Sequence, residues 1–80
     1  EKKQTKAFVS TISNGINVRF SQQISGTIVI SNILGSVEHR EQMYDQNSFE
    51  YITNQLAKGI YLFTIHDAKG KNLSGKFVVE

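Results

Sequence analysis

Apolar and polar residues alternate with a period of two along most of this chain, which is the pattern of half-buried β-strands. Two apolar runs between residues 56 and 79 show it most clearly, and the polar segment Asp67–Gly70 separates them. The run at 60–65 is apolar on both sides, which predicts a central strand that is either covered on both faces or has a partly covered aromatic face. The run at 73–79 predicts one buried face and one wetter face. Together the two runs predict a β-hairpin.

The segment between the two runs has the residues of a type I turn. The Asp67 carboxylate can accept hydrogen bonds from the backbone two residues on, and Gly70 tolerates a positive φ. The same spacing of an Asx residue and a glycine recurs at Asn32–Gly35. Upstream of the hairpin, Leu56 is expected to enter the core, and Gly59 to supply a backbone conformation that a residue with a Cβ would resist.

The remaining apolar runs predict five further strands, at residues 6–12, 16–20, 27–31, 37–44 and 49–53. Asn14-Gly15 predicts a type I′ turn, and the polar stretches 21–25 and 45–48 predict a loop and a turn. The run 37–44 contains good helix formers but no amphipathic stripe, so it is interpreted as an exposed edge strand. The expected fold is all-β: a small Ig-like β-sandwich of about seven short, mainly antiparallel strands.

Length and composition limit what this fold can contain. A chain of 80 residues makes one domain with a thin core. We assign that domain to residues 6–80 and interpret the polar residues 1–5 as a linker remnant. The chain has no cysteine, so it has no disulfide, and its two histidines are too few for a structural zinc site. We expect no metal and no cofactor.

No group of residues in the sequence predicts catalysis. Ser31 or Ser74 could be combined with His39 and an acid, but no strained nucleophile turn or oxyanion loop accompanies them. A Gly-rich phosphate loop and metal-ligand spacing are also absent from the sequence. We therefore expect a protein that is not an enzyme and has no catalytic residue.

Charge and aromatic residues suggest two kinds of binding surface. The net charge is +2, and lysines gather around the last hairpin. On exposed strands lysines discourage edge-to-edge pairing, so a basic patch for nucleic acid or lipid headgroups is the less favoured interpretation, and no nucleic-acid partner is expected. Tyr44, Tyr51 and Tyr61 could instead form a sugar-stacking platform, which leaves a carbohydrate-binding or adhesion module as the alternative function.

One series of residues in the last third of the chain has a recognisable order. It runs Leu56-x-x-Gly59-Ile60-Tyr61, then Ile65, then Gly70-Lys71, and finally Lys76-Phe77-Val78-Val79. This series resembles the C-terminal sorting domain of the type IX secretion system of Bacteroidota (type A, Por secretion tail). The family usually opens with a Tyr-Pro-Asn-Pro-like segment, for which residues 9–15 are the nearest counterpart here, without proline.

The resemblance implies a non-catalytic signal that directs its parent protein through the periplasm to the outer membrane, where the cargo stays on the cell surface or is secreted. The implied partners are the outer-membrane shuttle (PorV) and the sortase (PorU), which usually removes the domain and joins the cargo to anionic lipopolysaccharide. A domain retained on its cargo as a surface anchor or signal is a variant of this interpretation. Exposed strand edges could also pair two copies into a dimer.

The candidate residues form two groups. A last strand can be bound at its edge by strand addition, so the expected partner-recognition residues are Lys76, Phe77, Val78, Val79 and Glu80. The residues expected to present that strand on its hairpin are Leu56, Gly59, Tyr61, Asp67, Gly70 and Lys71.

Overall fold

The computed structural model describes residues 5–80 as an all-β domain of five antiparallel strands. The strands are β1 (Ala7–Ile12), β2 (Gly15–Asn32), β3 (Val37–Ile52), β4 (Gly59–Asp67) and β5 (Asn72–Val79). Among the described residues there is no helix long and apolar enough to cross a membrane. The small Ig-like β-sandwich expected from the sequence is confirmed, with fewer and longer strands.

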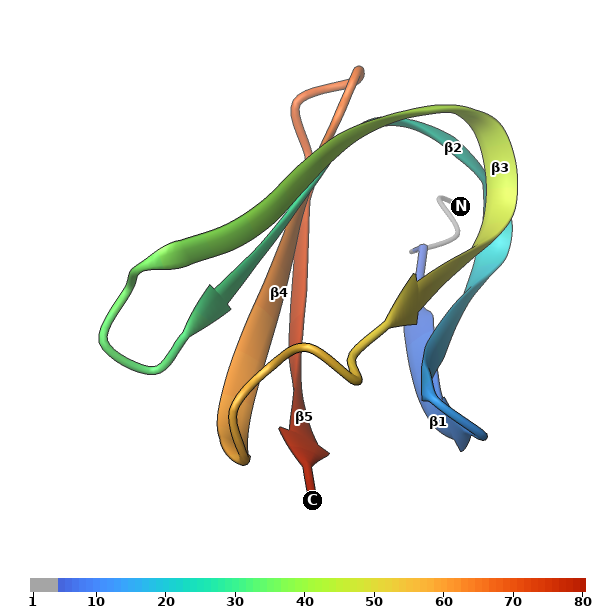
Figure 1. The fold of residues 1–80 in the computed structure, drawn as a ribbon. Coiled ribbons are helices and arrows are strands. Elements are labelled where there is room, and N and C mark those ends of the chain that lie inside the picture. Colours follow the sequence, from blue (N-terminus) through green and yellow to red (C-terminus); the bar gives the residue numbers. More distant parts are fainter. Residues whose placement is uncertain (1–4) are drawn as a thin grey trace.

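Two bent strands account for the difference in strand number. The strands predicted at 16–20 and 27–31 are the two ends of β2, and those predicted at 37–44 and 49–53 lie in β3. The loop predicted at 21–25 and the turn predicted at 45–48 are therefore wrong. Both segments continue as strand, with register shifts between β2 and β3 at Arg19/Ile24 and Ile24/Gly26. Figure 1 shows β2 and β3 curling together over the top of the domain.

Hydrogen bonds explain why these polar segments do not leave the sheet. The Ser25 carbonyl accepts from the Ala68 N–H at 2.8 Å, and the Ser25 hydroxyl accepts from the Asp45 N–H at 2.9 Å. Asp45 adopts a φ of 47°, a conformation that aspartate tolerates better than most residues. Neighbouring strands thus satisfy the backbone through the bend, as a β-bulge does.

The curled sheet forms two layers. The first layer contains β1, the beginning of β2 and the end of β3, while the second contains the beginning of β3, the end of β2, then β4 and β5. The predicted hairpin of β4 and β5 is confirmed by continuous antiparallel pairing from Gly59 to His66. Within residues 5–80, β1 and β5 each pair with one neighbour only, so each leaves an unpaired edge there. The start of β3 is also an edge, as predicted.

The core lies between the layers and consists of side chains from β2, β3, β4 and β5. The buried apolar residues are Ile16, Val18, Phe20, Ile24, Ile28, Ile30, Met43, Phe49, Tyr61, Phe63, Ile65 and Phe77. The aromatic side of β4 is thus its core face, whereas Ile60 and Leu62 on its other side remain exposed. The prediction that β4 is covered on both faces, or has an incompletely buried aromatic face, is wrong: the aromatic face is fully buried, and no residue from 5 to 80 covers the outer face at Ile60 and Leu62.

The first hairpin forms with a different turn from the predicted one. Ile12 pairs with Gly15, so the connecting residues are Ser13 and Asn14, and neither has a positive φ. A type I′ turn centred on Asn14-Gly15 is therefore excluded. Gly15 instead lies so close to the Tyr51 carbonyl that a Cβ would sit 2.0 Å from its oxygen. Gly15 is therefore needed because β3 approaches it closely, and not because of the turn.

The expected division of the chain into a linker remnant (residues 1–5) and one domain (residues 6–80) stays a prediction. Residues 6–80 all contribute to one sandwich or its connections. Of the linker remnant assigned to residues 1–5, residues 1–4 lie outside the described part of the chain.

Candidate functional site

The turn that joins β4 to β5 is held by one aspartate side chain. Asp67 Oδ1 accepts from the backbone N–H groups of Lys69 at 2.9 Å and Lys71 at 2.8 Å. The Asp67 N–H donates to the Lys71 carbonyl at 2.9 Å, and the Gly70 N–H donates to the Asp67 carbonyl at 3.1 Å. Gly70 has a φ of 86°, which a residue with a Cβ rarely adopts. Lys71 thus contributes through its backbone, and its side chain is exposed.

The turn between β2 and β3 uses the same hydrogen bonds. Asn32 Oδ1 accepts from the N–H groups of Leu34 and Ser36 at 2.9 and 3.0 Å, and Gly35 has a φ of 93°. The repeated Asx-x-x-Gly spacing therefore predicted two turns of one type, and the structure confirms them. The rigid turn at Asp67 fixes where β5 begins relative to β4.

At the other end of the hairpin, Tyr61 ties β4 to the segment before it. The Tyr61 hydroxyl donates to the Ala57 carbonyl at 2.7 Å, and Leu56 packs half-buried against the core. Gly59 has a φ of 151°, and, apart from its two chain neighbours, no residue from 5 to 80 has a heavy atom within 4 Å of the place its Cβ would occupy. The glycine is thus required by backbone conformation and not by space. Leu56, Gly59 and Tyr61 act together on the entry into β4.

The five candidate recognition residues alternate between the two faces of the second layer. Phe77 is buried and stacks on Tyr61, with ring centroids 5.7 Å apart and an interplanar angle of 18°. Val79 is half-buried against the core, whereas Lys76, Val78 and Glu80 are exposed. Phe77 and Val79, which point inward, hold the strand in place. The three exposed residues remain available to a partner.

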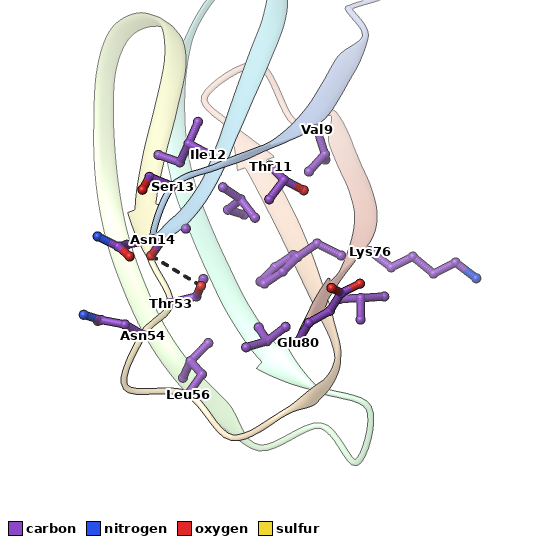
Figure 2. Close-up of a pocket in the computed structure, with 15 residues that line it drawn as sticks. Val9, Thr11, Ile12, Ser13, Asn14, Thr53, Asn54, Leu56, Lys76 and Glu80 are labelled. Atoms are coloured by element: carbon purple, nitrogen blue, oxygen red, sulfur yellow. Dashed lines mark hydrogen bonds between the residues drawn. The ribbon is translucent and has the colours of Figure 1, made fainter.

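A groove of about 630 Å³ lies beside this segment, between the edges of β1 and β5. Figure 2 shows Val9 and Thr11 on one side of the opening, Leu56 towards its far end, and Lys76 extending away from it. Residues 76–80 form the opposite wall, and Ile16 and Phe77 are among the apolar residues that line it. The sequence did not predict this groove. Its only signal is the alternation of Val9 and Thr11, which face the sandwich interior but are not covered.

The hydrogen-bond alternation shows which backbone groups of β5 are free. The bond from the Asp67 N–H to the Lys71 carbonyl marks this pair as hydrogen-bonded. In an antiparallel ladder such pairs alternate with pairs that exchange no bonds, so Phe77 and Val79 turn their N–H and C=O groups towards β4. The corresponding groups of Lys76 and Val78 then point to the unpaired edge. Their side chains and their backbone groups are both available at the surface.

Among the described residues, the side chain whose pKa clearly departs from its ordinary value is Tyr51, which lies away from this edge. Burial raises the pKa of Tyr51, and the negative charge of Glu38 and the nearby Tyr61 raise it further. The Tyr51 ring also stacks on His39 at 4.8 Å, and His39 Nε2 lies 2.9 Å from Glu41 Oε1. These contacts link the two halves of β3, since His39 and Tyr51 lie towards its opposite ends.

The structure does not bring together the residues that were considered for catalysis or for sugar binding. Ser31 and Ser74 lie on strand positions that face away from the sandwich interior, whereas His39 pairs with Ile30 on the inner side. Tyr44 is exposed, Tyr51 is half-buried and Tyr61 is buried, so the three tyrosines form no common platform. Within residues 5–80, no three His, Cys, Asp or Glu side chains are grouped to hold a metal ion.

An antiparallel sandwich with an unpaired strand edge can bind an extended segment of a partner by strand addition. The chain matches the Por secretion tail family, the secretion system C-terminal sorting domain, over residues 11–80, and it belongs to that family. It is therefore a type IX secretion sorting domain, as the residues from Leu56 to Val79 indicated. The family is one of sorting signals for export to the cell surface or for secretion.

One comparison with solved structures adds information about the fold. The crystal structure of CopC from Methylosinus trichosporium OB3b is similar, with a TM-score of 0.50 and 19% sequence identity, over 94% of this chain and 81% of that chain. At this identity the likeness concerns the fold alone. Comparison with curated proteins gives no significant match.

Proposed function

We propose that this domain is a non-catalytic address that type IX secretion machinery reads on its parent protein, and that Lys76, Phe77, Val78, Val79 and Glu80 are the residues it contacts. One observation carries the proposal: the end of β5 has an unpaired edge beside a groove lined by both apolar and polar residues, on a hairpin fixed at both ends. Family membership supports the general role, and this edge supports the assignment to particular residues.

The mode of contact we propose is strand addition. A segment of the receptor pairs with the N–H and C=O groups of Lys76 and Val78, and its side chains enter the groove. Leu56, Gly59, Tyr61, Asp67, Gly70 and Lys71 act indirectly, because they hold the hairpin that presents this edge. Phe77 contributes from inside through its stack on Tyr61.

The finer steps of the pathway are part of the same proposal. The domain passes through the periplasm, is bound by the shuttle PorV, and is removed by the sortase PorU as the cargo is joined to anionic lipopolysaccharide. A domain retained on the cargo is the variant of this scheme. If the exposed edges pair with each other instead, a dimer forms that competes with the receptor.

A fusion experiment tests the proposal. Residues 1–80 are joined to the C-terminus of a periplasmic reporter that has a signal peptide, and the fusion is expressed in a strain with a working type IX system and in a strain lacking the translocon. We expect the reporter outside the cell only in the first strain, and its mass reports removal of the domain. Deletion of residues 76–80 should trap it in the periplasm. Export that survives the deletion would refute the assignment of these residues.

A further inference from the structure

Two residues of opposite charge lie in one row of side chains at the end of β5. Lys76, Val78 and Glu80 are all exposed, and because successive side chains of a strand point to opposite faces, they share the outward side. Within residues 5–80, neither Lys76 nor Glu80 forms a salt bridge. The row therefore presents a positive end, an aliphatic centre and a negative end to a strand that adds to this edge.

This row is complementary to itself when two copies of β5 pair in the antiparallel direction. If Val78 of one copy faces Val78 of the other, Lys76 of each copy faces Glu80 of the other. On the inward side, Phe77 of each copy then faces Val79 of the other. Opposite charges directly across a strand pair attract, and two such pairs form in this register.

The backbone hydrogen-bond pattern allows the same register. The N–H and C=O groups of Lys76 and Val78 point to the free edge, and the same alternation turns the Glu80 N–H that way. With Val78 on the two-fold axis, the two Val78 residues exchange both bonds, and Lys76 and Glu80 form the next hydrogen-bonded pair. The groove between β1 and residues 76–80 leaves room beside these groups. Charge and backbone thus select one register.

Other ways of pairing two copies lack this agreement. In β5, a register centred on Lys76 would place two lysines opposite each other, and one centred on Phe77 would place both charges opposite uncharged residues. At the free edge of β3, registers centred on Arg40 or Glu41 would oppose like charges. The edge strand β1 (Ala7–Ile12) has no charged residue, so charge selects no register there.

We propose that two copies of this domain pair through the edges of β5, antiparallel and centred on Val78, and join their second layers into one continuous sheet. The pairing covers the exposed Val78 of both copies beside Ile60, its partner on β4, and forms two ion pairs between Lys76 and Glu80. The dimer uses the backbone groups that we assign to the receptor strand, so it hides the address until the copies separate. This consequence rests on the proposed function, whereas the dimer itself does not.

Sedimentation equilibrium of the purified chain at low ionic strength tests the proposal. We expect a concentration-dependent dimer with a dissociation constant below about 1 mM. Lys76→Glu alone, or Glu80→Lys alone, makes both charge pairs repulsive and should raise the dissociation constant about tenfold or more. An equal mixture of the two variants should dimerise again, because one variant then carries two acids in the row and the other carries two bases.

A matched variant separates this contact from a general effect of charge. Lys69→Glu makes the same change in charge in the turn between β4 and β5, where the side chain is exposed, and should leave the dissociation constant unchanged. Circular dichroism of each variant reports folding. A wild-type chain that stays monomeric up to about 1 mM would overturn the proposal, as would equal weakening by Lys69→Glu or a mixture that fails to dimerise. Export of the reporter fusion would still leave the sorting proposal standing.

Discussion

Asp67 and Asn32 show how a single side-chain oxygen can define a turn. In each turn this oxygen accepts from the backbone N–H groups two and four residues on, at distances between 2.8 and 3.0 Å. Because the acceptor and its donors lie within five residues, the geometry is largely local. An amide oxygen in Asn32 and a carboxylate oxygen in Asp67 therefore take the same position in the two turns.

We expect Asp67→Ala to lower the free energy of unfolding by about 1–2 kcal/mol, because both backbone donors lose their acceptor. Asp67→Asn should change it by less than about 0.5 kcal/mol, since Asn32 already performs this role with an amide oxygen. Urea denaturation of the two variants measures the difference. Equal destabilisation by alanine and asparagine would show that the carboxylate charge, and not the shared hydrogen-bond geometry, holds the turn.

Tyr51 gives the domain a stability that depends on pH. Its pKa in the folded state is raised above the ordinary value of 10.0, chiefly by burial and then by Glu38 and Tyr61. The folded state therefore holds the phenolic proton more tightly than the unfolded state. This contribution is fully present below about pH 10 and is lost as pH rises through the raised pKa.

Replacing Tyr51 with phenylalanine should therefore flatten the alkaline part of the stability curve. The melting temperature of the wild-type chain should fall more steeply above about pH 10 than that of Tyr51→Phe, and the two should run parallel at neutral pH. The comparison cancels the titration of lysines and of the other tyrosines, which both proteins share. Parallel curves at all pH values would contradict the raised pKa.

Among the elements, the β4–β5 hairpin is fixed at both ends by different contacts. The Asp67 turn fixes the start of β5, while Tyr61 holds both the Ala57 carbonyl and the Phe77 ring. The hydroxyl acts on the connection before β4, and the ring acts on the end of β5. These two effects of one side chain are separable.

Tyr61→Phe should lower the free energy of unfolding by about 1 kcal/mol and loosen the connection at 53–58, because it removes the bond to Ala57 but keeps the ring. Phe77→Leu should instead loosen the end of β5. Amide hydrogen exchange resolves the two regions. Faster exchange over the same residues in both variants would argue against separate roles for the hydroxyl and the ring.

An element of this fold could be predicted from the sequence when the interactions that form it join residues close together in the chain. Strand positions, the two Asx-x-x-Gly turns and the core faces of β2 and β5 follow from period-two alternation and turn chemistry. The segments 21–25 and 45–48 were misassigned because polar composition does not distinguish a loop from a bulged strand. Along β2 the buried side chains stay on even positions from Ile16 to Ile30, and this unbroken parity was the available signal.

Features of the site that arise from tertiary arrangement were harder to predict. Leu56, Tyr61 and Phe77 were identified from sequence order, but the bond from Tyr61 to Ala57 and the stack on Phe77 depend on side-chain placement. The groove depends on two edges, in β1 and β5, that are distant in sequence and meet only after the sheet curls. Nothing in the local pattern of residues 7–12 specifies which strand they will face.

At the scale of the whole molecule, the curled sheet leaves strand edges unpaired within residues 5–80. A sandwich this small cannot cover every strand, and unpaired edges invite pairing with other chains. Here the edge of β5 carries an exposed lysine and lies next to a groove lined by both apolar and polar residues. An edge that a soluble domain would normally protect is thus suited to recognition by a receptor strand, which is the central claim about this sorting domain.

The most direct test of that claim replaces Val78 with proline in the reporter fusion. The Val78 N–H points to the unpaired edge, so proline removes a donor for the receptor strand without breaking the ladder to β4. Val78→Ala, which keeps that donor, is the matched control, and the melting temperature of each isolated domain reports folding. We predict that Val78→Pro folds but is not exported, while Val78→Ala is exported. Normal export of a folded Val78→Pro variant would contradict recognition by strand addition at this edge.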